Sequence, residues 1–205
     1  MAHRIREAMT DTDNTPLGGE GKVVEADETY YGKPAAAPAK LTAKGTPFLK
    51  GIKKRNSRPV VALVERGGRA KVFHVAVADK ATVSKLVMDN VHPASRLHTD
   101  ESRLYVGAAD VFASHETVKH SAGEYARGDV NTNSAEGFFG VFKKGMRGVY
   151  QHCSEKHLGR YVTEFGFRHN TRSALGFTDT DRTDLAILGT VGKRLTYRRS
   201  NEAHV

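Results

Sequence analysis

KVVEADETYY, at residues 22–31, sets the architecture of this chain, because it alternates like a β-strand yet carries acids in its middle. Its side chains divide between two sides, Val24, Ala26 and Tyr30 against Glu25, Asp27 and Thr29. Acidic residues are unfavourable inside a β-strand, so the presence of this cluster requires an explanation. A binding site is one reason, and a solvent-facing edge strand is another.

The segments that follow predict a hairpin and then alternating helices and strands. PVVALVE at 59–65 and AKVFHVAVA at 70–78 are joined by a Gly67-Gly68 turn, which is typical of a β-hairpin. Later elements are expected in the order helix, strand, short helix, strand, helix, helix, at 80–91, 95–100, 102–112, 116–120, 134–147 and 154–170. This order indicates an α/β fold, a ribonuclease H-like mixed sheet flanked by helices.

Composition favours a nucleic-acid partner. The 205 residues carry a formal net charge of +9, which attracts polyanions, although a merely basic protein has the same balance. Cys153 is the single cysteine, so neither a disulfide framework nor a cysteine-based zinc site is expected within this chain. No apolar run approaches the roughly 20 residues that cross a bilayer. We therefore expect a cytoplasmic protein with no membrane partner.

Three parts are expected along the chain. Residues 1–20 are interpreted as an amino-terminal remnant or linker, and residues 21–175 as the catalytic domain. Within that domain, residues 33–58 are rich in Ala, Pro, Gly and Lys and are predicted to form a flexible basic loop between two strands. Residues 176–205 are interpreted as a basic carboxy-terminal tail.

Three acids are candidate metal ligands. Phosphodiester bonds are commonly cut or joined with two divalent cations about 4 Å apart, held by carboxylates from separate elements. Asp27 in the first strand, Asp100 after the fourth and Glu136 early in a late helix are the candidates for binding two Mg²⁺ or Mn²⁺ ions. If the first and fourth strands are neighbours, Asp27 and Asp100 meet in mid-sheet. Taken alone, an Asp at a strand end is more often a turn-former.

The late helix has a structural and a functional interpretation. Asn133 and Glu136 have the spacing of a capping box, which would satisfy the first free amides of the helix. Lys143 follows Glu136 by two turns and so shares its face, and Arg147 extends that face. Lys143, Lys144 and Arg147 are candidates for contacting DNA phosphates, whereas a solvated charged face is the alternative.

Several strings in this chain resemble DDE-type insertion-sequence transposases of the IS-fifteen-ninety-five group, with its ISXO-two-like catalytic domain. They are AHRIREAM at 2–9, VVEADETYYGK at 23–33, HTDESRLY at 98–105, and the long segment 118–172 with its TN-xx-E, FKKG, GVYQH, KHLGRY and EFxFRxNxR elements. The resemblance implies that Asp27 and Asp100 are the first two metal-binding acids and that Lys143 is the trailing lysine of the family.

The third catalytic position is open between two residues. The family signature is often described with Asn before the Lys, which points to Asn133, whereas the seven-residue spacing of other DDE enzymes points to Glu136. Helix geometry favours Glu136, because the ten residues between Asn133 and Lys143 leave their faces roughly 80° apart. An amide oxygen can also bind a metal, so Asn133 stays a candidate catalytic residue.

The resemblance leads to two functional hypotheses. The first is a transposase that cleaves DNA at the ends of an insertion sequence and joins them to target DNA, working as a homo-oligomer on DNA. The second is a catalytically silent DNA-binding remnant. It is motivated by the absence of the cysteine-rich zinc ribbon that full-length relatives carry ahead of AHRIR, which a chain with Cys153 alone cannot form.

Overall fold

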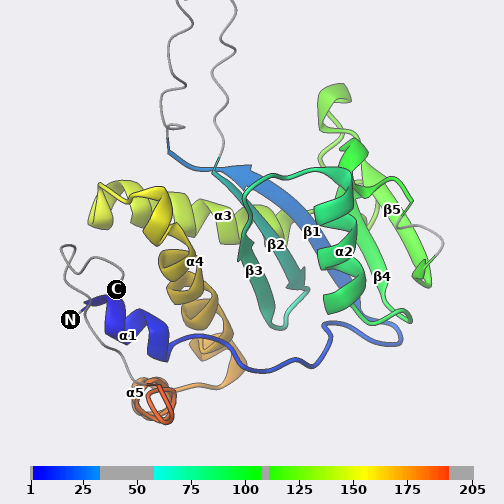
Figure 1. Cartoon of the computed structure of the whole chain (residues 1–205). Coiled ribbons are helices and arrows are strands. Elements are labelled where there is room, and N and C mark those ends of the chain that lie inside the picture. Colours follow the sequence, from blue (N-terminus) through cyan, green and yellow to red (C-terminus); the bar gives the residue numbers. More distant parts are fainter. Residues whose placement is uncertain (1, 33–57, 108–110, 194–205) are drawn as a thin grey trace, which may run out of the picture.

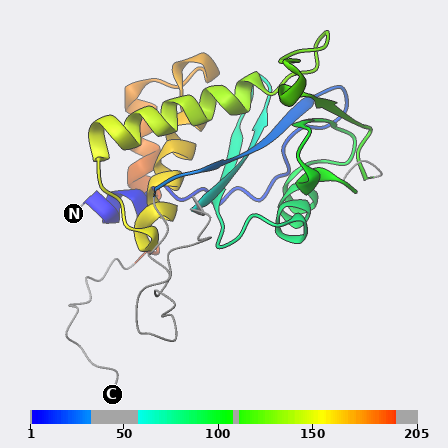
Figure 2. The same ribbon diagram turned by 90° about the horizontal axis from the view of Figure 1, so that it is seen from above.

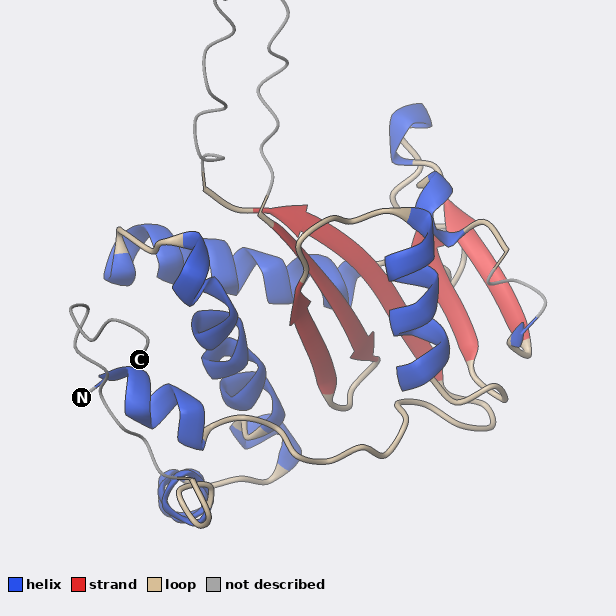
Figure 3. Cartoon of the chain, in the orientation of Figure 1, coloured by secondary structure: helices blue, strands red, loops and turns tan. Residues whose placement is uncertain are grey.

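In the computed structural model, residues 2–32, 58–107 and 111–193 are described, and they form a five-stranded sheet with helices on both faces (Figure 3). The strand order across the sheet is β3-β2-β1-β4-β5. The strands are β1 Val23–Tyr30, β2 Pro59–Glu65, β3 Ala70–His74, β4 Arg96–Asp100 and β5 Ser114–Val118.

β1 is the central strand and has a different kind of neighbour on each side. It pairs antiparallel with β2 and parallel with β4, so the sheet is mixed. The hairpin β2-β3 extends the sheet on one side, and β5 pairs parallel with β4 on the other. This topology agrees with the α/β, ribonuclease H-like mixed sheet that the sequence predicts, and it makes the first and fourth strands direct neighbours.

Helices cover the sheet in two layers (Figures 1 and 2). One helix, α2, lies on one face, and α3 lies on the opposite face, while α4 packs on β3 and on α1, and α5 packs on α1. The helices are α1 Ala2–Ala8, α2 Lys80–Asn90, α3 Asn133–Gly145, α4 Glu155–Asn170 and α5 Asp179–Leu188. No helix among the described residues has both the length and the apolar character needed to cross a membrane.

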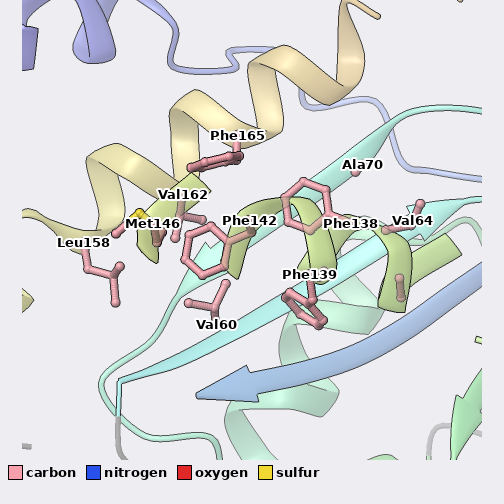
Figure 4. Close-up of a cluster of buried hydrophobic side chains, with 12 residues drawn as sticks. Val60, Val64, Ala70, Phe138, Phe139, Phe142, Met146, Leu158, Val162 and Phe165 are labelled. Carbon is pink, nitrogen blue, oxygen red and sulfur yellow. The ribbon is translucent and has the colours of Figure 1, made fainter. Parts of the chain in front are cut away.

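Two apolar cores lie on the two faces of the sheet. The core under α2 includes Val24, Ala26 and Val87, all fully buried. The core under α3 and α4 stacks phenylalanines of both helices on the small side chains of β2 (Figure 4). β2 is buried on both faces, which explains why its sequence PVVALV is apolar throughout rather than alternating.

Several predicted boundaries differ from the structure. The strand predicted at 116–120 is β5, Ser114–Val118, and the described part of the short helix predicted at 102–112 contains a 3₁₀ turn at Arg103–Tyr105. β3 ends at His74 rather than at 78, because β2 begins at Pro59 and offers no further residues to pair. The helix predicted to run to 147 leaves α-helical geometry after Gly145 and continues as a π-helix, Met146–Tyr150. Most of the basic loop predicted at 33–58, and residues 108–110 of the predicted short helix, lie outside the described residues.

Polar side chains fix α4 at its two sides. The Asn170 amide donates to the Ala70 carbonyl at 2.9 Å and accepts from the Ala70 N–H at 2.7 Å, which docks the end of α4 on β3. On the outer side, the buried Arg6 and Glu164 form an ion pair of 2.7 Å that docks α1. The segments predicted as an amino-terminal linker and a carboxy-terminal tail therefore contain helices that pack on one another and, for α1, on α4.

Removing the central aromatic ring of the α3 core tests this packing. Phe142 is fully buried between Tyr31 and Phe165, with ring centroids at 5.7 and 5.3 Å. Phe142→Ala is expected to lower the free energy of unfolding by about 3–5 kcal/mol, measured by urea denaturation. Val149→Ala, at a residue 73% exposed, is the control and should change it by less than about 0.5 kcal/mol. Equal effects of the two substitutions would contradict the assigned core.

Candidate active site

Asp27 and Asp100 lie on neighbouring strands at the same level of the sheet. Ala26 on β1 pairs in parallel with Thr99 on β4, and the two aspartates are the next residues along each strand. Side chains alternate along a strand, so both aspartates face the side that α3 covers. Residues separated by more than seventy positions in the sequence are thus brought together by the parallel pairing of β1 with β4, as the sequence predicts.

Burial and neighbouring negative charges act together on Asp27. Burial raises the pKa of Asp27 to about 7, helped by the charges of Glu28, Asp100 and Glu136 and opposed by the hydrogen bond from the Glu28 N–H. The pKa of Asp100 is also raised, chiefly by burial, although it accepts the Ser102 N–H at 2.9 Å. Several carboxylates therefore repel one another in a partly desolvated pocket, which is an environment that a divalent cation would relieve.

Glu28 belongs to the same electrostatic cluster but has its own partners on the α2 side. Its carboxylate accepts hydrogen bonds from the Tyr105 hydroxyl at 2.8 Å and the Ser102 hydroxyl at 3.2 Å. Burial raises the pKa of Glu28, and the charge of Asp100 adds to the effect. Ser102 contacts both Asp100 and Glu28, so this turn after β4 holds the two acids in place.

Glu25, fully buried on β1, holds the amino terminus of α3. Its carboxylate accepts the backbone N–H groups of Ser134 at 2.6 Å and Ala135 at 3.1 Å, and the Ser134 hydroxyl at 3.0 Å. The capping box predicted between Asn133 and Glu136 is wrong, because the N-cap is Thr132 and its side chain makes no capping bond. A strand carboxylate caps the helix instead, where its charge favours the positive end of the helix dipole.

Arg66 completes this anchor from the turn between β2 and β3. Its guanidinium pairs with Glu25 at 2.7 Å and donates to the carbonyl oxygens of Asp129 at 2.9 Å and Asn131 at 3.2 Å. The same side chain therefore neutralises a buried carboxylate and fixes the loop that leads into α3. We call the assembly of Glu25, Arg66 and the first turn of α3 the helix clamp.

The helix clamp sets where Glu136 lies. Glu136 is one residue beyond Ala135, it is about half exposed, and its charge contributes to the raised pKa of Asp27. Its Oε1 lies 3.5 Å from His120 Nε2 and accepts the Thr132 hydroxyl at 3.3 Å. The His120 backbone N–H donates to Glu101, next to Asp100, at 2.6 Å. The charge of Glu136 thus acts on Asp27, and His120 contacts both Glu101, next to Asp100, and Glu136 on α3.

The other predicted site residues occupy different parts of α3. Asn133 is exposed at the first position of the helix and lines a cavity on the α4 side, together with Ser134 and Gly137. Lys143 lies two turns after Glu136 on the continuous α-helix, half-buried, with its ammonium 6.0 Å from the Phe139 ring centroid. Lys144 is exposed.

Arg147 departs from the predicted face. It is exposed, but it lies in the π-helix that follows α3, so the α-helical spacing used to align it with Glu136 and Lys143 does not apply there.

The donor set fits divalent cations that prefer oxygen ligands. Mg²⁺ is usually held by one or two carboxylates together with water and substrate phosphates, and Asp27 with Asp100 meets that requirement. Among the described residues, no three His, Cys, Asp or Glu side chains are gathered closely enough to hold an ion by themselves. The arrangement therefore suits an ion bound jointly by protein and substrate rather than an all-protein cage.

Several residues of this region were not predicted from the sequence. The sequence marks Glu25 only as part of an acidic cluster, although its alternation onto the same side as Asp27 is a usable signal. Arg66 and His120 carry no local pattern that marks them, because their partners come from β1, β4 and α3.

Comparison with known proteins identifies related sequences. A family described as the ISXO2-like transposase domain matches residues 16–170. An uncharacterized protein in transposable element ISH50 of Halobacterium salinarum is 28% identical over 159 residues, covering 71% of this chain and 51% of that protein. The chain thus spans about half the length of this curated relative.

Substituting the buried carboxylate tests the helix clamp. Glu25→Gln removes the charge that pairs with Arg66 and caps α3, so the free energy of unfolding should fall by about 3 kcal/mol in urea denaturation. Glu116→Gln is a matched control, because Glu116 pairs with Arg96 on the surface with 36% of its side chain exposed, and it should cost less than about 1 kcal/mol. Similar losses in both variants would contradict the clamp.

The raised pKa of Asp27 predicts a pH dependence of stability. In metal-free buffer the folded state keeps this proton up to about pH 7, whereas the ordinary value is 3.8, so stability falls as pH rises through that range. Asp27→Asn should therefore be more stable than the wild type at pH 8, by on the order of 4 kcal/mol, and nearly equal at pH 4. The exposed Asp89→Asn serves as control. A constant difference between Asp27→Asn and wild type at all pH values would refute the assignment.

Proposed function

The chain belongs to the ISXO2-like transposase domain family, and from that premise we propose that it is a metal-dependent DNA-cleaving and strand-transferring transposase domain. The observation that carries the proposal is the pairing of β1 with β4, which aligns Asp27 and Asp100 on one face beneath α3. Its substrates are the DNA ends of an insertion sequence and the target DNA. We propose that a homo-oligomer acts on them, and that residues 21–175 form the catalytic domain, with 1–20 as linker and 176–205 as basic tail.

Asp27 and Asp100 are the residues that would hold two Mg²⁺ or Mn²⁺ ions. Such ions would supply activation of the attacking oxygen and stabilisation of the leaving oxygen in an in-line displacement at phosphorus. The chain contributes orientation, because both carboxylates are carried by hydrogen-bonded strands, and Asp100 is further held by Ser102.

Glu136 is the proposed third acid, in preference to Asn133. The negative charge of Glu136 acts on Asp27, and its carboxylate is adjacent to His120 on the β4 side of α3. Asn133, by contrast, lines the cavity on the α4 side of the same helix. Lys143 and Lys144 are the proposed contacts for DNA phosphates beyond the acids, with Arg147 as a further contact from the π-helix.

A DNA-binding domain without cleavage activity is the second candidate. It is supported by the formal net charge of +9, which favours binding to a polyanion whether or not the chain cleaves it. This candidate predicts salt-sensitive duplex binding and no metal-dependent nicking.

Nicking of a supercoiled plasmid tests the two candidates. With Mn²⁺ or Mg²⁺ the wild type should convert supercoiled plasmid to open circles, and Asp100→Asn should lower that rate at least about 100-fold, because a shared ligand is lost. Glu136→Gln should have a comparable effect, and Asn133→Ala should retain most of the rate.

Asp129→Asn is the matched control, since Asp129 is an exposed aspartate that pairs with Arg96 away from the acids. It should leave the rate of nicking nearly unchanged. Plasmid binding without nicking by the wild type, at every concentration of Mn²⁺, would favour the second candidate. Full nicking by Asp100→Asn would refute the metal-site assignment.

A further inference from the structure

The segment EFGFRHNTR at 164–172 contains polar residues with two different kinds of partner. Glu164 is buried and pairs with Arg6 and Arg168, and Asn170 docks α4 on Ala70 of β3. These contacts explain Glu164, Arg168 and Asn170 as parts of the fold. Arg172 and His169 are not explained in this way.

Arg172 is a half-buried cation without a carboxylate partner. Its guanidinium donates to the His169 carbonyl at 2.7 Å, and within the described residues no carboxylate oxygen lies within salt-bridge distance of it. Burial alone lowers the pKa of Arg172. A cation that is partly desolvated and unpaired is costly, and an anion bound next to it would remove that cost.

Arg172 lies at the edge of a cavity of about 440 Å³ between α3, α4 and the end of β2. This volume is within the range of sites that bind small molecules or single nucleotides. The cavity has an apolar lining from Phe138, Phe165 and Val141, and Val141 is 65% exposed at the protein surface. Asn133 contributes a polar side chain from the first turn of α3.

His169 adds a neutral ring to the wall of the same cavity. Its Nε2 is buried and has no hydrogen-bond partner among the described residues, and its ring packs edge-on against Phe138 at 5.5 Å. Burial and the nearby Arg172 lower the pKa of His169 to about 4, against a backbone hydrogen bond with Gly68 that raises it, so the ring is neutral near pH 7.

We propose that this cavity binds one unpaired nucleotide of the substrate DNA, with the base against Phe138 and Phe165 and a flanking phosphate on Arg172. An apolar lining with aromatic rings suits the face of a base, the amide of Asn133 suits its polar edge, and the guanidinium of Arg172 suits a phosphate. The cavity adjoins the first turn of α3, on the opposite side of that helix from Glu136. The inference rests on the proposed function only in taking DNA as the substrate.

Fluorescence anisotropy with two labelled duplexes tests the proposal. One duplex is fully paired and the other carries a single unpaired thymidine, and both are titrated in EDTA at fixed salt so that no cleavage occurs. The wild type should bind the bulged duplex about tenfold more tightly, as expected for one base stacked on aromatic rings. Arg172→Met should reduce this preference to nearly none. Lys85→Met, which removes one charge from the exposed side of α2, should retain it.

A second variant separates loss of binding from loss of folding. Gly137 lines the cavity on α3, and a side chain added there meets no atom within 4 Å. Gly137→Leu should therefore fill the cavity while the helix gains stability, since glycine is a poor helix former. Its melting temperature should equal or exceed that of the wild type, and its preference for the bulged duplex should be lost. Gly159→Leu, at an equally open position of α4 outside the cavity, should keep the preference.

Each outcome bears on the cavity separately from catalysis. Equal affinity of the wild type for both duplexes, or an unchanged preference in Gly137→Leu, would overturn the nucleotide site. Plasmid nicking is measured independently with Mn²⁺, so a chain that prefers the bulged duplex but never nicks would retain this site and lose the proposed catalytic function. A chain that nicks plasmid but shows no preference for the bulged duplex would keep the proposed catalytic function and lose the nucleotide site.

Discussion

The helix clamp is the contact on which the candidate active site depends. α3 crosses the sheet over β2 and β1, and apolar packing alone would allow it to slide along its own axis. Glu25 fixes the axial position, because its carboxylate binds two amides of the first turn while Arg66 ties the preceding loop to the same group. The position of Glu136 relative to Asp27 is therefore fixed by hydrogen bonds and an ion pair that start from Glu25, two residues before Asp27 on β1.

The acids and the core make opposite demands on β1. One face of the strand contributes Val24 and Ala26 to a dry core, whereas the other carries Glu25 and Asp27 under α3. The charge of Glu25 is neutralised by Arg66 and bonded by the amides at the start of α3, so removing that charge would leave both partners unsatisfied. Asp27 has no such compensation within the described residues and is destabilising when ionised, a cost that is common where side chains are arranged for binding rather than for stability.

Much of this architecture could be predicted from the sequence, and the remainder depends on contacts between distant segments. Alternation in KVVEADETYY and the hairpin turn at Gly67 predict β1, β2 and β3, and a ribonuclease H-like order makes Asp27 and Asp100 neighbours. The prediction of a capping box was wrong because the first amides of α3 are bonded by Glu25, which lies over a hundred residues earlier in the sequence and is not visible to a local rule. The π-helix after Gly145 and the cavity beside Arg172 arise where α3 meets α4, so no single segment encodes them.

The attachment of Asn170 to Ala70 also bears on the solubility of the protein. β3 is an outer strand of the sheet, and an outer strand exposes backbone groups to which a foreign strand can add. The Asn170 amide bonds the Ala70 N–H and carbonyl as the backbone of an added strand would, so these two groups are not available to another molecule. Until α4 has docked, the outer edge of β3 can pair with other chains. A nascent chain is therefore protected against this route to aggregation only after the last third of its sequence has been made.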